Sequence, residues 1–365
     1  MNASTRLQKA TQTVVQSIFS PASFDFWAGH LDATWSWQTP LARITARDLT
    51  AKDSVTLTLK PNRHVQPFMA GQHVQLTVEI NGVRVSRSYS PSLHTALDGT
   101  FMITVKRMQG GKVSAWLCSE ACVGQVVEIG AAFGEMTLLQ SHPQRLFLAA
   151  GSGITPLISM IRAWARGDRA EAITLLYWAR TREELCFVSE LNALQQHHAN
   201  FKVYFVLTQQ DQLQTGEQSG RISPELLANV AVDLNHSLVY ACGPAGFVEQ
   251  ARLYSGNAAG FYGEAFSLSA VIESDSDTAE QLVNIELTES KRTLQVPVGQ
   301  PILAALEAQG LRPASGCRMG LCNTCACIKQ SGTTEHILSR DRNDEAGSTV
   351  RICVSRACTD LSLAL

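Results

Sequence analysis

Short runs of alternating apolar and polar residues recur through the first part of the chain and predict β-strands. Turn-forming residues, such as Asn81-Gly82 and Gly110-Gly111, separate these runs, and this spacing is typical of a small antiparallel barrel. We therefore expect a β-rich domain over residues 38–140. Its predicted strands cover residues 41–49, 54–59, 73–80, 101–107 and 126–129.

The pattern changes between residues 141 and 266, where apolar runs alternate with stretches of helical periodicity. This rhythm is typical of a parallel sheet covered by helices, so we expect a second domain of α/β type. Its predicted strands cover residues 145–150, 173–178, 202–208 and 237–241, and its predicted helices cover residues 156–165 and 183–197.

Two further segments and a third domain complete the chain. Residues 267–281 are polar, rich in Ser and Asp and free of aromatics, which predicts a linker. Residues 282–365 then predict a compact domain with a hairpin, a helix ended by Gly310 and a strand at 350–354 that carries Cys353. Residues 1–37 form a leader that is helical to about Phe19 and then aromatic. The leader either packs on the next domain as a strap or contacts a membrane or partner.

Composition limits the compartment and the partners. The length of 365 residues suits two or three domains, and a net charge of −2 does not favour nucleic acid. Glycine and proline interrupt the most apolar stretch, residues 146–161, so it does not predict a membrane span. Because the N-terminus lacks the apolar core of a secretory signal, we expect a cytoplasmic protein.

Six of the ten cysteines fall between residues 317 and 358, which indicates a metal site. Cys317, Cys322 and Cys325 have the spacing C-x4-C-x2-C, and Cys353 follows as a distant fourth cysteine. That spacing is typical of plant-type 2Fe–2S ferredoxins, in which each iron needs two thiolates. The alternative is a structural zinc site, which usually has paired C-x2-C knuckles. Cys327 lies outside the spacing and is interpreted as a small buried residue.

The sequence Arg87-Ser88-Tyr89-Ser90 lies at the end of a predicted strand and combines a cation, an aromatic ring and two serine hydroxyls. A guanidinium binds phosphate through a forked geometry, and an aromatic face can stack on a ring. Taken alone, the four residues are better explained by an exposed strand with a solvated Arg87. Two features that follow in the sequence support an anion-binding role: Lys106, and a turn at which a helix begins. The amides at the N-terminus of a helix and a nearby hydroxyl suit an anion. The residues of that turn are Gly111, Val113 and Ser114.

A second anion-binding pattern follows the first strand of the α/β domain. Gly151 and Gly153 allow a close approach of the backbone to phosphates, and Thr155-Pro156 suits the first turn of a helix. The triplet Cys242-Gly243-Pro244 lies at the end of what we expect to be the last parallel strand. Cys242 is either a residue of the site or a buried core thiol.

Taken together and in this order, the motifs resemble the ferredoxin–NADP reductase superfamily, followed by a C-terminal plant-type 2Fe–2S ferredoxin domain. The resemblance implies an antiparallel β-barrel flavin domain, a parallel α/β nicotinamide domain and a β-grasp ferredoxin domain. It also implies that Arg87 pairs with flavin phosphate, that Tyr89 and Ser90 lie beside the flavin ring, and that Cys242 lies near the nicotinamide. Glu264 matches a carboxylate near the flavin. The catalytic candidates are therefore Tyr89, Ser90, Cys242 and Glu264.

Two arginines, Arg180 and Arg182, follow the second strand of the α/β domain, where the 2′ position of the ribose is expected. Arginine there favours the 2′-phosphate of NADPH over NADH, and Arg180 is the preferred contact. The alternative is that both are solvated residues at the entry of a helix. The aromatic leader resembles that of reductases of bacterial fatty-acid desaturase systems, which implies FAD. The domain order resembles that of reductases of phthalate dioxygenase systems, which implies FMN, and we prefer FAD.

The resemblance implies an oxidoreductase that passes electrons from NADPH through FAD and a 2Fe–2S cluster to an oxygenase-type acceptor. We expect this acceptor to be a fatty-acid desaturase that is contacted transiently at a membrane. The alternative acceptors are a Rieske-type dioxygenase or another monooxygenase. A hypothesis of a different class is a non-enzymatic module that carries a cluster or is stabilised by zinc.

Overall fold

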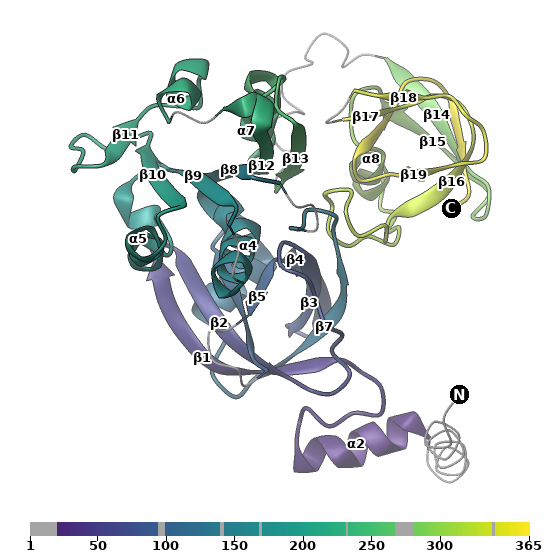
Figure 1. The fold of residues 1–365 in the computed structure, drawn as a ribbon. Helices are drawn as coiled ribbons and strands as arrows, with labels where there is room; N and C mark the ends of the chain where they lie inside the picture. Colours follow the sequence, from purple (N-terminus) through teal and green to yellow (C-terminus); the bar gives the residue numbers. More distant parts are fainter. Residues whose placement is uncertain are drawn as a thin grey trace, which may run out of the picture.

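The computed structural model describes residues 20–93, 99–138, 142–167, 170–230, 233–266, 281–337 and 340–365 (Figure 1). The helix expected before Phe19 and nearly all of the expected linker lie outside these residues. Within them, no helix combines the length and the apolar character needed to cross a bilayer.

A helix that the sequence analysis did not predict begins the described chain. Helix α2 (Pro21–Leu31) starts at Ser20, whose hydroxyl accepts a hydrogen bond from the Ser23 amide at 3.1 Å, and Pro21 occupies its first turn. This Ser-Pro pair is an ordinary helix-start signal that the aromatic composition obscured. The residues after the helix contact the first sheet, where Arg43 pairs with Asp32 at 2.6 Å.

The first domain is an antiparallel sheet with the strand order β4-β3-β7-β1-β2-β6-β5. Alternate side chains face its core, and inward residues such as Leu57, Leu76 and Ile103 are fully buried, as the period of two predicts. The strands are β1 (Leu41–Ala51), β2 (Ser54–Pro61), β3 (His73–Ile80), β4 (Val83–Tyr89), β5 (Pro91–Leu93), β6 (Phe101–Lys106) and β7 (Val126–Phe133), and helix α3 (Lys112–Ser119) follows β6.

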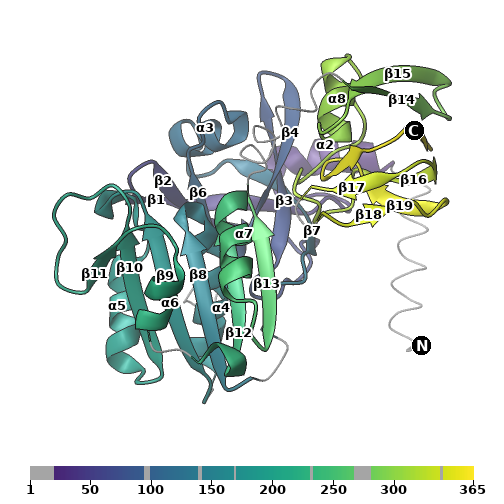
Figure 2. The same cartoon turned by 90° about the horizontal axis from the view of Figure 1, so that it is seen from above.

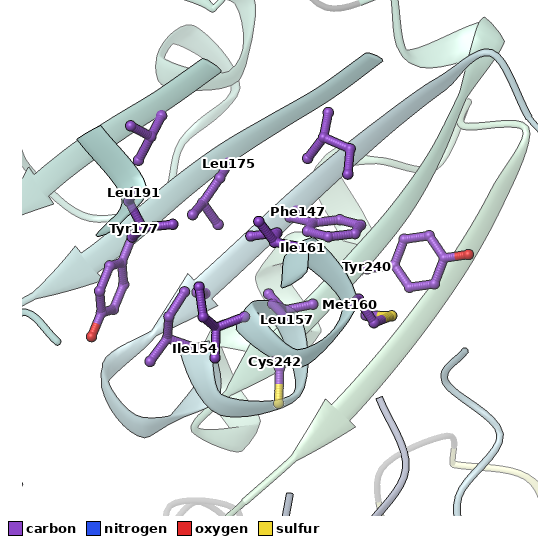
Figure 3. Close-up of a cluster of buried hydrophobic side chains, with 14 of the residues drawn as sticks. Phe147, Ile154, Leu157, Met160, Ile161, Leu175, Tyr177, Leu191, Tyr240 and Cys242 are labelled. Atoms are coloured by element: carbon purple, nitrogen blue, oxygen red, sulfur yellow. The ribbon is translucent and has the colours of Figure 1, made fainter. Parts of the chain in front are cut away.

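The second domain is a parallel sheet with the strand order β11-β10-β9-β8-β12-β13. Its strands are β8 (Gln144–Ala150), β9 (Ala172–Ala179), β10 (Phe201–Leu207), β11 (Glu217–Ser219), β12 (Ser237–Gly243) and β13 (Gly260–Ala265). Its helices are α4 (Ile154–Arg166), α5 (Val188–His197), α6 (Pro224–Asn229) and α7 (Ala245–Tyr254), with short 3₁₀ turns at η1 (Gly151–Gly153), η2 (Arg182–Glu184) and η3 (Leu234–His236). Helix α4 packs its apolar side on this sheet, and together they form the largest buried cluster (Figure 3).

Two sequence predictions for this domain were wrong. The helix expected from residue 183 begins at Val188, because Phe187 has a left-handed backbone (φ 63°) and only a short turn precedes it. The strand that carries Cys242 is not the last parallel strand, since β13 pairs with it along its length.

The third domain combines a five-stranded sheet, β15-β14-β21-β16-β19, with a three-stranded sheet, β18-β17-β20. Their strands are β14 (Leu282–Leu287), β15 (Arg292–Pro297), β16 (Ala326–Ser331), β17 (Thr334–His336), β18 (Arg342–Asn343), β19 (Ser348–Arg351), β20 (Ser355–Ala357) and β21 (Leu361–Leu363), and α8 (Ile302–Ala308) packs on the first sheet. This is the expected β-grasp arrangement. Figures 1 and 2 place this domain beside β3, β4 and β7, on the side away from α5 and β11.

The strand expected to carry Cys353 ends earlier than predicted. Strand β19 stops at Arg351, and the Val354 amide donates to the Arg351 carbonyl at 3.1 Å. Cys353 therefore lies in a tight turn between β19 and β20. The apolar run that suggested a strand is buried because this turn packs into the domain core.

Candidate functional site

All three domains line one large cleft. Its volume is about 2010 Å³, well above the roughly 300–1,000 Å³ of a site for one small molecule. The cleft runs from the loops after β9 and β12, past the ends of β4 and β6, to the cysteine loop of the C-terminal domain. Its size and its lining suit more than one extended ligand.

The four residues of the Arg87-Ser88-Tyr89-Ser90 motif all line this cleft, where strand β4 ends. The Ser88 hydroxyl is buried without a hydrogen-bond partner in the described structure, so a polar ligand atom would satisfy it. Arg87 is half-buried, and this burial lowers the pKa of its guanidinium. Burial raises the pKa of the Tyr89 phenol, which therefore stays neutral.

The turn before α3 also faces the cleft, through Gly111, Val113 and Ser114. The Ser114 hydroxyl accepts from the Met108 amide at 3.1 Å and donates to the Gly111 carbonyl at 3.2 Å, so it also shapes the turn. Lys106 lines the cleft, but its Nζ lies 2.6 Å from Glu184 Oε2 of the second domain. A cofactor role for Lys106 would therefore compete with this ion pair.

The two glycines of the α/β loop have different surroundings. Gly151 lines the cleft with a positive φ of 55° and open space where a Cβ would stand. A Cβ on Gly153 would lie 1.9 Å from the Cys242 carbonyl oxygen, so this glycine allows the loop to pack on β12. Thr155 lines the cleft, whereas Gly153 and Pro156 do not. The sequence analysis expected both glycines to approach phosphate, and the structure brings only Gly151 to the cleft.

The two candidate arginines, Arg180 and Arg182, differ in their partners and in their access to the cleft. Arg180 lines the cleft with a side chain that is 60% exposed, and its Nε lies 2.9 Å from Glu184 Oε1. Arg182 is engaged elsewhere, because its Nε and Nη2 each donate to Glu217 at 2.6 Å and Nη2 also donates to the Gln212 carbonyl. This hydrogen bond with Glu217 raises the pKa of Arg182. Of these two arginines, Arg180 lines the cleft and Arg182 does not.

Cys242 and Glu264 lie behind the cleft surface. The Cys242 side chain is fully buried in the cluster around Ile154 and Leu157, and this burial raises the pKa of its thiol well above the usual value (Figure 3). Its neighbours Gly243 and Pro244 do line the cleft. The structure therefore brings the backbone after Cys242 to the cleft, and not its sulfur.

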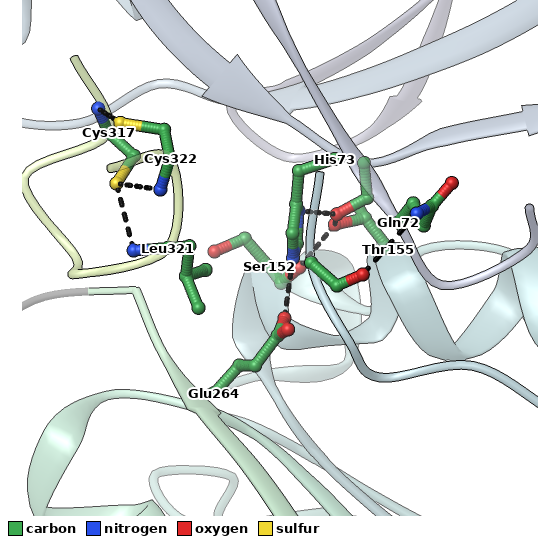
Figure 4. Close-up of polar contacts among 10 residues, drawn as sticks. Gln72, His73, Ser152, Thr155, Glu264, Cys317, Leu321 and Cys322 are labelled. Atoms are coloured by element: carbon green, nitrogen blue, oxygen red, sulfur yellow. Dashed lines mark hydrogen bonds and ion pairs between the residues drawn. The ribbon is translucent and has the colours of Figure 1, made fainter. Parts of the chain in front are cut away.

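Glu264 has a buried partner that the sequence analysis did not identify. His73, the first residue of β3, lies 2.5 Å from Glu264 Oε2 through Nε2 and 3.0 Å from Ser90 Oγ through Nδ1. Figure 4 shows its ring between Glu264 and the region of Thr155. The sequence separation of 191 residues explains why no local pattern indicated this contact.

The cysteine loop is shaped to direct backbone amides at sulfur. The amides of Leu321 and Cys322 each donate to Cys317 Sγ at 3.3 Å, and the Cys317 amide donates to Cys322 Sγ at 3.1 Å (Figure 4). The Met319 amide also donates to Cys317 Sγ at 3.3 Å. Left-handed residues, including Arg318 (φ 58°), permit this turn. Amides that point at thiolate sulfur are the usual surroundings of an iron–sulfur cluster.

The four candidate ligands are arranged as two pairs. Cys317 and Cys322 form one pair, and a hydrogen bond with Cys353 lowers the pKa of Cys325 to about 6 in the other. The described residues contain no group of three or more ligands gathered for one metal ion. Two thiolate pairs fit a binuclear cluster, in which each iron takes two cysteines, better than one tetrahedral zinc.

The cysteine loop lies against the first domain. A Cβ on Gly316 would stand 2.1 Å from Gln75 Nε2, and this same nitrogen donates to Thr324 Oγ1 at 3.4 Å. Cys317, Arg318 and Cys353 line the shared cleft. The candidate cluster site and the candidate flavin site therefore open into the same space.

Comparison with known families agrees with this arrangement. Residues 42–138 match an oxidoreductase FAD-binding domain, residues 147–253 match an oxidoreductase NAD-binding domain, and residues 285–358 match a 2Fe-2S iron-sulfur cluster binding domain. The chain is therefore an oxidoreductase with FAD, nicotinamide and 2Fe–2S sites.

Individual proteins extend the match over most of the chain. An NADPH oxidoreductase of Mycobacterium tuberculosis is 27% identical over 97% of this chain and 92% of its own length. The phenoxybenzoate dioxygenase subunit beta of Ectopseudomonas oleovorans is 30% identical over 80% of this chain and 86% of its own length. The structure of phthalate dioxygenase reductase shares the fold, with a TM-score of 0.60 and 24% identity over 89% of this chain and 97% of that one.

The chain belongs to the family of ferredoxin reductases that join FAD-binding, NAD-binding and 2Fe–2S domains. Its relatives include a glycine betaine monooxygenase reductase subunit of Pseudomonas aeruginosa and the ferredoxin reductase component of a 3-ketosteroid-9-alpha-monooxygenase of Rhodococcus rhodochrous.

Proposed function

We propose that this reductase takes electrons from NADPH, passes them through FAD to a 2Fe–2S cluster and delivers them to a fatty-acid desaturase. The observation that carries the electron path is the single cleft lined by all three domains. A flavin can accept two electrons as hydride and release them singly, which is the chemistry that links NADPH to a one-electron cluster.

The chain's own residues would bind and orient these groups. Arg87 would pair with the flavin phosphate, Ser88 would bond a polar flavin atom, and Tyr89 would lie against the ring. The α3 turn and the Gly151 loop would each present backbone amides to phosphates. The cluster would be held by Cys317, Cys322, Cys325 and Cys353, with the loop amides bonding their sulfur atoms.

We place the domain boundaries at residues 38–140 for the flavin domain, 141–266 for the nicotinamide domain and 282–365 for the ferredoxin domain. The described strands support these limits, because β1 starts at Leu41, β8 at Gln144 and β14 at Leu282.

The preference for NADPH rests on Arg180, which lines the cleft with a largely exposed side chain. Its guanidinium can bind a 2′-phosphate in place of Glu184. The choice of FAD rests on the FAD-binding domain that matches residues 42–138.

The desaturase proposal rests on helix α2. Phe26 and Trp27 are 58% and 67% exposed on it, and Leu31 is 79% exposed, which leaves an apolar surface beside the flavin domain. Such surfaces mark contacts with partners or membranes. The second candidate acceptor is a Rieske-type oxygenase, which the name of the phenoxybenzoate dioxygenase relative favours.

An anaerobic titration tests the electron path. The flavin of the purified protein is extracted and identified, and the protein is then titrated with NADPH and, separately, with NADH while its visible spectrum is recorded. We expect FAD, with bleaching of both flavin and cluster bands, faster with NADPH. A protein that binds flavin but shows no cluster absorbance after anaerobic reconstitution would contradict the 2Fe–2S step and favour a zinc site.

A reconstituted assay tests the acceptor. Cytochrome c reduction gives the intrinsic electron output, and a membrane diiron desaturase and a Rieske oxygenase are compared as acceptors. We expect desaturase turnover, which decreases in Trp27→Ser while cytochrome c reduction stays unchanged. Turnover of the Rieske oxygenase alone would favour the second candidate.

A further inference from the structure

A buried line of three side chains crosses the boundary between the flavin and nicotinamide domains. It runs from Glu264 Oε2 to His73 Nε2 at 2.5 Å, and from His73 Nδ1 to Ser90 Oγ at 3.0 Å. The three residues are 6%, 1% and 4% exposed. Glu264 lies behind the cleft, whereas His73 and Ser90 line it, so the line ends at the cleft surface.

The partners of His73 determine where its ring proton lies. The rings of Phe133 and Phe266 also lie beside it, at 5.8 and 6.0 Å between centroids, and neither ring offers a competing acceptor. A carboxylate can only accept a hydrogen bond, so Glu264 requires the proton on Nε2. The Nδ1 atom of a neutral ring is then an acceptor, as in Ser–His–Asp triads, where the acid fixes the tautomer.

In this arrangement the hydroxyl proton of Ser90 is used in the hydrogen bond to His73. A serine hydroxyl has one proton and two lone pairs, and the proton is donated to His73 Nδ1. Thr155 Oγ1 lies 3.4 Å from Ser90 Oγ, but it lies closer to the Ser152 carbonyl, at 3.0 Å, and donates there. The oxygen of Ser90 is left with lone pairs for a ligand and no proton to give.

We propose that Glu264 and His73 act as positioning residues that make Ser90 a hydrogen-bond acceptor toward the cleft. The ligand class that this selects is a ring N–H group. This inference rests on the proposed flavin site, because a reduced flavin ring carries N–H where the oxidised ring carries a bare nitrogen. Ser90 would then bind the reduced ring more strongly than the oxidised ring, and Glu264 would set this preference without touching the ligand.

The tautomer of His73 is a direct test that needs no turnover. Protein labelled with ¹⁵N-histidine, with oxidised flavin bound, is measured by long-range ¹H–¹⁵N correlation, and a His73→Gln variant assigns the signal. We expect one proton, on Nε2. A proton on Nδ1, or on both nitrogens, would overturn the inference, because Ser90 would then keep its own proton.

Substitutions test the effect on the ligand. Ser90→Ala removes the acceptor, and Glu264→Leu removes the group that fixes the tautomer. We expect each to lower the ratio of reduced-flavin to oxidised-flavin affinity by about fivefold, the magnitude of one neutral hydrogen bond. This ratio is obtained from the flavin midpoint potential of the variant relative to that of the free flavin.

Ser159→Ala is the matched control. Ser159 is also a buried serine at this domain boundary, but its hydroxyl donates to the Pro91 carbonyl at 2.9 Å. We expect its affinity ratio to stay at the wild-type value. Circular dichroism confirms folding, and Ser90→Ala keeps the test decisive if Glu264→Leu does not fold. Variants that match the Ser159→Ala ratio would refute the inference, whereas a wild-type protein that binds no flavin would refute the proposed function instead.

Discussion

The flavin domain has two junctions, and they are built differently. Its junction with the nicotinamide domain is dense in polar contacts, whereas its junction with the ferredoxin domain has, among the described residues, one direct side-chain hydrogen bond, Gln75 to Thr324 at 3.4 Å. The first junction includes Lys106–Glu184 at 2.6 Å, Arg162–Ser92 at 2.7 Å, Ser159–Pro91 at 2.9 Å and His73–Glu264 at 2.5 Å.

This difference matches what crosses each junction: a hydride between nicotinamide and flavin, and single electrons between flavin and cluster. A hydride moves between atoms about 3–3.5 Å apart, so the nicotinamide must be held accurately against the flavin. A single electron needs no bonding contact between donor and acceptor. The junction of the flavin and ferredoxin domains, called here the light junction because the described residues make few direct contacts across it, is therefore sufficient. Light junctions also permit relative movement of domains. The predictions below perturb each junction separately, from the largest expected effect to the smallest.

Removal of a cluster ligand should stop electron transfer beyond the flavin and leave the reduction of the flavin by NADPH intact. In Cys322→Ser we expect loss of cluster absorbance and of cytochrome c reduction, while NADPH still bleaches the flavin, because the dense junction is intact. Cys327→Ser is the control, since this buried thiol is not in either cysteine pair and burial raises its pKa to about 11. Cluster loss in Cys327→Ser as well would contradict the assignment of ligands.

Removal of Arg162 should weaken the dense junction. Its Nε and Nη2 bond Glu190 at 2.7 Å, and its Nη1 bonds Ser92 of the flavin domain, with only 8% of the residue exposed. In Arg162→Ala we expect a loss of roughly 1–3 kcal/mol in the free energy of unfolding, measured by urea denaturation.

The control for Arg162 is an ion pair that lies within one domain. Arg84 pairs with Glu128 on the surface of the flavin sheet, and its side chain is 65% exposed. Arg84→Ala should change the free energy of unfolding by less than about 1 kcal/mol. Equal losses in the two variants would show that the dense junction adds nothing beyond a surface pair.

A methyl group at Gly316 should disturb the light junction. Its Cβ would meet Gln75 Nε2 at 2.1 Å and Cys322 Sγ at 2.8 Å. In Gly316→Ala we expect electron transfer from flavin to cluster to slow severalfold, because the methyl group would push the cysteine loop away from Gln75 and lengthen the path of the electron, as measured by stopped-flow absorbance. The rate should recover in large part in Gly316→Ala/Gln75→Ala. A double variant as slow as the single one would place the fault at the cluster, and not at the junction.

The smallest expected effect concerns the coenzyme. Arg180 is tied to the dense junction through Glu184, which also binds Lys106. In Arg180→Ala we expect the ratio of kcat/KM for NADPH over NADH to decrease about fivefold, because a charge-assisted bond to phosphate is lost. Arg182→Ala should leave the ratio nearly unchanged, since Glu217 already holds that arginine. A larger effect at Arg182 would reverse the assignment.

Local patterns predicted many of the strands of this protein, although β11 and β13 were not predicted. The run at residues 73–80 matches β3, and the predicted strands of the second domain differ from the observed ones by one or two residues. These elements follow from periodicity, which is a property of neighbouring residues. The spacing of Cys317, Cys322 and Cys325 was equally informative, because one loop supplies all three.

Contacts between distant segments could not be predicted in this way. His73 lies beside Glu264 only because β3 and β13 meet at a domain boundary. The sequence already favoured Arg180 over Arg182, and the fold adds the reason, because Glu217 engages Arg182. Gly153 matched a phosphate-loop pattern, yet its small size serves packing against Cys242. Motifs indicate which chemistry is present, and the fold decides which member of a motif performs it.

The close approach at Gly153 also sets limits on how the enzyme can change over evolution. Because any side chain there would collide with backbone atoms of β12, a single substitution cannot open new space in this loop. Gly151 has open space beside it but needs its left-handed backbone, while the Arg180 side chain is largely exposed and forms an ion pair with Glu184. A change of the proposed coenzyme contact at Arg180 would therefore leave the packing of this loop on β12 unaltered.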